Sequence, residues 1–296
     1  MKRLLRYGVL FALLAGAAGW WATAPERVSE AQFAALSGDA AHGETVFWAG
    51  GCAACHSAPR SEDAERTILS GGRSFITDFG TFYAPNITPD PENGIGTWEL
   101  VDLANAMLHG TSPSGQHYYP AFPYTSYARI SPQDVADLWA FLQTLPASDI
   151  PSKRHEVGFP FSIRRALGGW KILFGGPAQI LSGTLPPMAT RGRDLVEGLG
   201  HCGECHSPRN ALGGIDYARW LGGAPNPSGK GRIPNITPAK LHWSEADLVE
   251  YFTSGFTPEY DSAGGEMAEV VQNLANLPRE DLHAIAVYLK IVPAVD

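Results

Sequence analysis

The sequence predicts an all-α fold, in which two tandem helical domains are joined by an ordered strap and preceded by one N-terminal transmembrane helix. Three observations support this prediction. A pair of cysteines followed by a histidine occurs twice, as Cys52-Ala53-Ala54-Cys55-His56 and as Cys202-Gly203-Glu204-Cys205-His206. The segments that follow the two motifs resemble each other at a period of roughly 150 residues, which indicates a duplicated domain. A basic N-terminus is followed by an uncharged apolar run.

The Cys-x-x-Cys-His spacing is typical of a c-type haem attachment site. Each thiol bonds to one haem vinyl group, and the histidine that follows binds the iron. A redox dithiol does not need the trailing histidine, and zinc sites rarely place histidine directly beside the second cysteine. The chain has 4 cysteines in all, so the two motifs use every one. We therefore predict two covalently bound haem c groups, held by Cys52, Cys55, His56, Cys202, Cys205 and His206.

Composition narrows the class of partner and the compartment. The 296 residues fit two domains of ordinary size, and 33 glycines with 23 prolines predict long loops. A net charge of -8 argues against a nucleic-acid partner and suits a soluble partner with a positive docking patch. Because haem attachment in bacteria takes place outside the cytoplasmic membrane, we expect a periplasmic protein.

Two interpretations of the N-terminus compete, a retained membrane anchor and a cleaved signal peptide. The uncharged run from Tyr7 to Ala24 is about 18 residues long, the lower limit for crossing a bilayer. Trp20 and Trp21 lie where an interfacial aromatic belt is expected. A small-x-small cleavage pattern ends at Ala24, but Pro25 would hinder cleavage. We favour the anchor, with the haem domains on the periplasmic side of the cytoplasmic membrane.

The repeat and the apolar periodicity define the domains. Asn86-Ile87-Thr88-Pro89 recurs as Asn235-Ile236-Thr237-Pro238. Asp39 and Thr190 are plausible N-caps of equivalent helices before the two motifs, and Ser131 is a plausible N-cap before Pro132. Further helices are expected over 98–109, 132–142 and about 279–291. In each domain the N-terminal and C-terminal helices should cross. No stretch alternates between apolar and polar residues for long enough to predict a sheet. The expected segments are an anchor or uncleaved signal (1–24), a linker (25–38), domain 1 (39–147), an interdomain strap (148–187) and domain 2 (188–296).

The expected strap has no helical periodicity and interleaves aromatic with basic side chains. One interpretation is a strap packed across both domains, and the other is a surface that lies on the membrane or on an anchored partner. We favour the packed strap, because so many large apolar groups rarely stay exposed.

The residues that would bind the sixth position of each iron lie far from the cysteine motifs in the sequence. Met267 follows the second motif by about 60 residues in a loop before the last helix, and a thioether ligand there would raise the reduction potential. The equivalent loop of domain 1, Tyr119-Pro120-Ala121-Phe122-Pro123-Tyr124, has Phe122 at its centre, which cannot bind iron. Three alternatives remain for the first haem: His117, Met107 on an apolar helix stripe, and an open iron. We favour His117, so the predicted iron ligands are His56, His206, Met267 and His117.

Together these motifs resemble the multihaem cytochrome c subunits of membrane-bound alcohol and gluconate dehydrogenases, and related dihaem class I c-type cytochromes. The segment Gly200-His201-Cys202-Gly203-Glu204-Cys205-His206-Ser207-Pro208-Arg209-Asn210 adds to the resemblance, which extends from about Asp39 to the C-terminus. It implies class I cytochrome c-like domains and transfer of electrons between proteins. Family members usually carry three haems and a methionine in the Tyr-Pro-Ala-x-Pro loop, whereas this chain has two motifs and Phe122.

The leading hypothesis is a dihaem electron-transfer subunit rather than a stand-alone enzyme. It would pass electrons from a periplasmic dehydrogenase toward a soluble cytochrome, a quinone or a terminal oxidase. The alternative is a dihaem oxidoreductase, peroxidase-like or acting on sulfur compounds, with the first haem as its active site. A haem-based sensor ranks last, because the chain lacks an output domain. We identify no catalytic acid–base residues.

Overall fold

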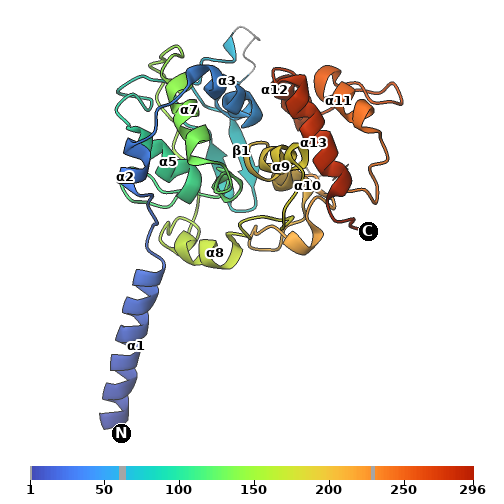
Figure 1. The fold of residues 1–296 in the computed structure, drawn as a ribbon. Helices are drawn as coiled ribbons and strands as arrows, with labels where there is room; N and C mark the ends of the chain where they lie inside the picture. Colours follow the sequence, from blue (N-terminus) through green and yellow to red (C-terminus); the bar gives the residue numbers. More distant parts are fainter. Residues whose placement is uncertain (1, 60–64, 228–230) are drawn as a thin grey trace.

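The fold is mostly helical, with one long helix apart from the rest (Figure 1). The structure is a computed structural model that describes residues 2–59, 65–227 and 231–296. Helix α1 (Lys2–Ala22) has no buried residue and extends away from the packed body. Within the described residues it is the one helix long and apolar enough to cross a membrane. The predicted apolar N-terminal helix is therefore confirmed.

The other helices form two groups in chain order. The first group consists of α2 (Glu30–Ala34), α3 (Ala40–Ala49), α4 (Cys52–His56), α5 (Leu100–His109), α6 (Tyr124–Tyr127) and α7 (Pro132–Leu142). The second consists of α8 (Ala166–Phe174), α9 (Pro187–Arg193), the π-helix η2 (Asp194–Leu199), α10 (Gly203–His206), the 3-10 helix η3 (Tyr217–Arg219), α11 (Glu245–Ser254), α12 (Glu266–Leu274) and α13 (Arg279–Ile291). The helices predicted over 132–142 and about 279–291 are confirmed, and the one predicted over 98–109 begins at Leu100.

Two of the three N-cap predictions agree with the structure. Asp39 caps α3 by accepting the Ala41 N–H at 2.9 Å, and Ser131 caps α7 in front of Pro132. The prediction for Thr190 is wrong, because α9 already begins at Pro187 and the Thr190 hydroxyl donates to the Leu185 carbonyl. Proline at the first helical position has no N–H group, so this helix start leaves one donor fewer to be capped.

Each group is built around one pair of crossing helices, as predicted. Helix α3 packs on α7, and α9 packs on α13. A Cβ atom on Gly43 would lie 2.0 Å from the Asp137 carbonyl oxygen, and one on Gly192 would lie 1.9 Å from that of Ala284. Both distances are far below van der Waals contact, so these crossings require glycine. Buried apolar side chains surround them, including Val46, Val135, Leu138, Leu195, Leu282 and Ile285.

Two short hairpins correct the all-α prediction. Strands β1 (Ser74–Thr77) and β2 (Gly80–Tyr83) pair antiparallel across a two-residue turn, with Thr77 opposite Gly80. Strands β3 (Ala224–Pro225) and β4 (Arg232–Ile233) form a smaller pair. Strands β1 and β2 have four residues each, and only Phe82 among them is buried. An apolar–polar alternation this short cannot be recognised in the sequence.

The segment expected to be a strap contains a helix, α8, that its apolar pattern did not predict. Its later part is packed as expected: Ile180, Leu181 and Leu185 contact the core, and Glu197 accepts the N–H groups of Ile180 and Leu181 at 2.8 and 3.0 Å. The packed interpretation is wrong for its earlier part, where Phe159 and Leu173 are 84% and 70% exposed.

Candidate haem sites

The two cysteine motifs form short helices of the same design. Cysteines three positions apart lie on one face of a helical turn, and the histidine ends that turn. His56 donates Nδ1–H to the Pro85 carbonyl at 2.8 Å, and His206 donates to the Pro234 carbonyl at 2.8 Å. Because a carbonyl can only accept, the proton of each neutral ring is on Nδ1. Each Nε2 therefore keeps its lone pair, which is the ligand that iron needs.

The repeated Asn-Ile-Thr segments hold these proline carbonyls in place. The Asn86 side-chain oxygen accepts the Thr88 N–H at 2.9 Å and the Thr88 hydroxyl at 2.7 Å. Asn235 accepts both groups of Thr237 at 2.8 Å. The Asn86 amide also donates to the carbonyls of Ser148 and Ile150, each at 2.8 Å. This repeat therefore fixes the turn that directly follows each proline.

The cysteines and histidines have protonation states that suit haem attachment. None of the four cysteines forms a disulfide bond. Burial raises the pKa of Cys52 to about 12, that of Cys55 to about 11 and that of Cys202 to about 12, so these thiols are neutral at pH 7. Burial also lowers the pKa of the two motif histidines, although the proline carbonyls partly oppose it. Neutral imidazoles suit iron ligation, because each keeps a lone pair on Nε2.

The two predicted distal ligands, Met267 and His117, and the alternative Met107 occupy three different environments. Met267 is half-buried at the start of α12 and contacts the core. Met107 is buried in α5, and the position equivalent to it in the second group, Phe252, is buried as well. His117 is only 2% exposed, and its Nε2 lies 3.0 Å from the Thr23 carbonyl oxygen while Nδ1 has no partner. The structure therefore directs His117 toward the linker after α1.

Two isolated β-bridges give the register between the halves. Thr111 pairs with His117, and Phe256 pairs with Ser262 in the same way. Phe122 follows His117 by five residues, and Met267 follows Ser262 by five residues. Phe122 and Met267 are therefore equivalent positions. The Phe122 ring packs on the Tyr127 ring with centroids 5.6 Å apart.

The first motif is joined to α12, in the second half of the chain, by an arginine that no sequence motif singled out. Arg73 donates to the Ala54 carbonyl within the first motif at 2.5 Å and pairs with Glu266 and Glu269 of α12. It therefore ties the first attachment helix to the helix that begins beside Met267. The partners are nearly 200 residues apart (Glu269 at a separation of 196), so no local pattern could have shown the pairing.

Helix α6 connects the two attachment segments directly. Thr125 and Ser126 donate to the Glu204 carboxylate, inside the second motif, at 3.1 and 2.8 Å. Tyr127 donates to the Gly50 carbonyl at 2.8 Å, and its ring centroid lies 5.7 Å from that of His201. His201 thus lies between the two attachment segments, and its place directly before Cys202 was the available signal.

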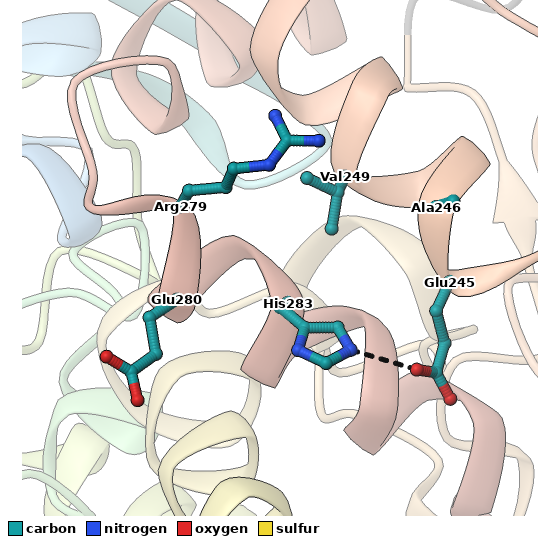
Figure 2. Close-up of a pocket in the computed structure, with 6 residues that line it drawn as sticks. All are labelled: Glu245, Ala246, Val249, Arg279, Glu280 and His283. Atoms are coloured by element: carbon teal, nitrogen blue, oxygen red, sulfur yellow. Dashed lines mark hydrogen bonds and ion pairs between the residues drawn. The ribbon is translucent and has the colours of Figure 1, made fainter.

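A surface pocket between α11 and α13 is separate from both motifs. Figure 2 shows His283 and Glu245 facing each other, with Nε2 and Oε2 2.9 Å apart. Both side chains are 46% exposed. The pocket is lined by Glu245, Ala246, Val249, Arg279, Glu280 and His283, without any of the predicted haem ligands.

Comparison with known proteins agrees with this geometry. Residues 40–146 match the family model described as Cytochrome c. The chain is 60% identical to "Diheme cytochrome c-type" from Cereibacter sphaeroides over the full length of both. It is 39% identical to "Fructose dehydrogenase cytochrome subunit" from Gluconobacter japonicus, covering 85% of this chain and 52% of that protein. It is 35% identical to "Gluconate 2-dehydrogenase cytochrome c subunit" from Pantoea cypripedii, covering 89% of this chain and 63% of that protein.

These findings confirm the predicted resemblance and the predicted cofactor. The motif geometry supplies two sets of thiols and imidazole, and a full-length relative at 60% identity is a dihaem c-type cytochrome. The chain belongs to the family of dihaem c-type cytochromes and carries two covalently bound haem c groups.

Proposed function

We propose that this chain is the electron-transfer subunit of a periplasmic dehydrogenase, and that it delivers electrons to a soluble cytochrome, a quinone or a terminal oxidase. The observation that carries the proposal is the duplicated histidine–proline arrangement, with the two attachment segments linked through α6. Each bound haem c supplies one-electron chemistry between ferric and ferrous iron. The protein's part is to hold the two groups close together in one packed body.

The site assignment follows the repeat. We assign residues 39–147 and 188–296 to two class I cytochrome c domains, linked by residues 148–187. Cys52, Cys55 and His56 would hold the first haem, and the corresponding residues Cys202, Cys205 and His206 the second. We assign Met267 as the residue that would bind the second haem iron on its distal side, because it follows the second motif by about 60 residues and lies in the first turn of α12, ahead of the last helix α13.

The distal side of the first haem is assigned differently from our sequence-based preference. His117 would have to give up its contact with Thr23 in order to reach iron. Phe122, which has no ligand atom, stands at the position equivalent to Met267. These contacts favour an open sixth position facing Phe122 over ligation by His117. Carbon monoxide binding to the reduced protein tests this, because it requires an open position at one haem.

Phe122 also favours a second candidate function, a dihaem oxidoreductase whose first haem is the active site. A substrate such as a peroxide needs an unoccupied position on iron. Turnover of hydrogen peroxide with a reduced electron donor, at a rate abolished by Phe122→Met, would support this function. Absence of turnover despite carbon monoxide binding would leave the electron-transfer role.

Two contacts support a retained membrane anchor. The Arg165 guanidinium lies 4.2 Å above the Trp20 ring, and the Thr23 carbonyl covers the buried His117 ring. Cleavage after Ala24 would remove both partners. We therefore propose that residues 1–24 stay attached and hold the haem domains on the periplasmic face of the cytoplasmic membrane.

A substrate-reduction assay in membranes tests the proposed partner. Relatives named as fructose and gluconate dehydrogenase subunits make these two compounds, together with an alcohol, the first substrates to add. In membranes from a strain that lacks this chain, substrate-dependent haem c reduction should be lost for one of them. Wild-type protein should restore it, and His206→Ala should not. Unchanged reduction in the deletion strain for every substrate that the parent oxidises would contradict the proposal.

A further inference from the structure

Helix α8 has its polar and apolar sides reversed relative to an ordinary surface helix. Its one cation, Lys171, points inward: Nζ donates to the carbonyls of His109 and Gly110 and lies 4.6 Å above the Tyr124 ring. Burial lowers the pKa of Lys171 to about 8, with Glu26 partly opposing it. On the outer side, Ile172 is 64% exposed and Leu173 is 70% exposed.

In water this arrangement is unfavourable on both sides. A surface helix normally turns its charged side chains outward and its apolar side chains inward. Here a desolvated ammonium and two exposed aliphatic side chains each add a cost. The free-energy cost of exposing Ile172 and Leu173 disappears if the surroundings of α8 are themselves apolar. The helix is therefore built for an environment other than bulk water.

The exposed aliphatic side chains of α8 belong to a larger surface that we call the strap patch. It consists of the exposed residues Phe159, Phe161, Ile163, Ile172, Leu173 and Leu212. Phe79 connects the two ends of this surface, because it contacts Phe161 and also Gly213, where a Cβ atom would lie 3.2 Å from its ring. Phe161 packs edge-on against Phe79 with ring centroids 5.1 Å apart, and Trp170 donates to the Leu212 carbonyl at 2.8 Å. Clustered apolar exposure of this kind marks an interaction surface.

The strap patch lies where α1 leaves the folded body. Figure 1 shows α8 at the edge of the fold from which α1 extends. Gly168 of α8 contacts Thr23, the residue after α1, so closely that a Cβ atom would lie 2.3 Å from the Thr23 carbonyl oxygen. Arg165, directly before α8, stacks on Trp20 in the last turn of α1. A bilayer crossed by α1 would therefore have its surface beside α8.

We propose that the strap patch rests in the boundary between lipid headgroups and acyl chains, with α8 lying parallel to the membrane plane. This inference depends on the proposed anchor role of α1. A lipid surface fits better than an anchored protein partner, because the patch is continuous with a helix of membrane-spanning length. Lys171 and Arg164 are engaged inside the protein, the latter through the His117 carbonyl at 2.9 Å. Binding therefore relies on apolar burial rather than on attraction to anionic lipid.

Spin labelling of the full-length holoprotein tests the proposal. The native cysteines are consumed by haem attachment, so an introduced cysteine is the one free thiol. Leu173→Cys reports on the patch, Leu13→Cys on α1, and Phe256→Cys is a matched control, because Phe256 is 61% exposed and follows α11. The protein is placed in phosphatidylcholine vesicles and in vesicles that also contain phosphatidylglycerol. Collision of each label with oxygen, which concentrates in lipid, is compared with collision with a water-soluble nickel chelate.

We expect the oxygen-to-nickel collision ratio to be several-fold higher at position 173 than at position 256, equally in both vesicle types and at high salt. A label at 173 that is as accessible to nickel as the label at 256 overturns the proposal. So does a label at 173 that is shielded only after a dehydrogenase subunit is added, which would identify a protein partner. The label at position 13 separates the two proposals: lipid contact at 13 without contact at 173 rejects the patch alone, whereas contact at neither position rejects the anchor.

Discussion

Replacing Gly192 by alanine should destabilise the C-terminal helix crossing, because the two backbones meet at this residue. The added Cβ atom would lie 1.9 Å from the Ala284 carbonyl oxygen and 2.7 Å from the Tyr288 Cβ. Ordinary van der Waals contact begins at 3.4 Å. Helices α9 and α13 would have to separate by about 1.5 Å, since a backbone carbonyl cannot rotate away within a helix.

The size of the effect follows from two opposing contributions. Overpacking in a well-packed core costs about 1–3 kcal/mol, and a clash with backbone lies at the upper end of that range. Alanine regains up to about 1 kcal/mol of helix propensity over glycine. We expect a net loss of about 2 kcal/mol, which corresponds to a fall in Tm of about 8–16 °C for a domain of roughly 100 residues.

Gly169 provides a matched control, because it lies inside α8 and an added Cβ atom would have nothing within 4 Å. Gly169→Ala should leave stability unchanged or raise it by up to about 1 kcal/mol. Thermal and urea unfolding of both holoproteins in detergent, followed by far-UV circular dichroism, measures the difference. A Gly192→Ala protein as stable as the wild type would refute the reasoning on helix contact.

Three further predictions concern the haem sites and their supports. Met267→Ala should lower the potential of the second haem by on the order of 0.1–0.2 V within the ~0.8 V that axial ligands span, and barely change the first; equal shifts in a redox titration would remove the assignment. Burial favours a raised pKa for Asp137, but hydrogen bonds from the Asp39 N–H, Gln133 and His42 outweigh it and lower the pKa. Asp137→Asn should therefore lower the free energy of unfolding by about 1–3 kcal/mol at pH 7, and the difference from the wild type should shrink as pH falls below about 4. A difference that stays constant with pH in urea unfolding would contradict this. Arg73→Gln should cost about 1 kcal/mol, less at high salt, and Arg73→Lys should restore part of it.

Local signals predicted much of the fold, and the two cysteine motifs that they indicate form short helices of the same design. The cysteine motifs, the caps at Asp39 and Ser131 and the last helix each depend on a few neighbouring residues. The Thr190 cap failed because Pro187 had already begun that helix. The hairpins were missed because their strands are four residues or shorter.

Long-range contacts account for the remainder. Nothing near Arg73 or Glu204 in the sequence shows that each contacts the opposite half of the chain. The outward apolar side of α8 also escaped prediction, because a rule that places apolar groups inside assumes water on the outside. The equivalence of Phe122 and Met267 became evident only through the paired β-bridges.

The two proline carbonyls have a consequence for the direction of electron flow. A hydrogen bond at Nδ1 makes an imidazole a stronger donor to its metal, and both bonds have the same length of 2.8 Å. The electronic push from the proximal side should therefore be nearly equal at the two irons. Under the proposed assignment, a downhill step between them would then originate on the opposite faces, where Met267 would supply a thioether to one iron and Phe122 only an aromatic ring to the other.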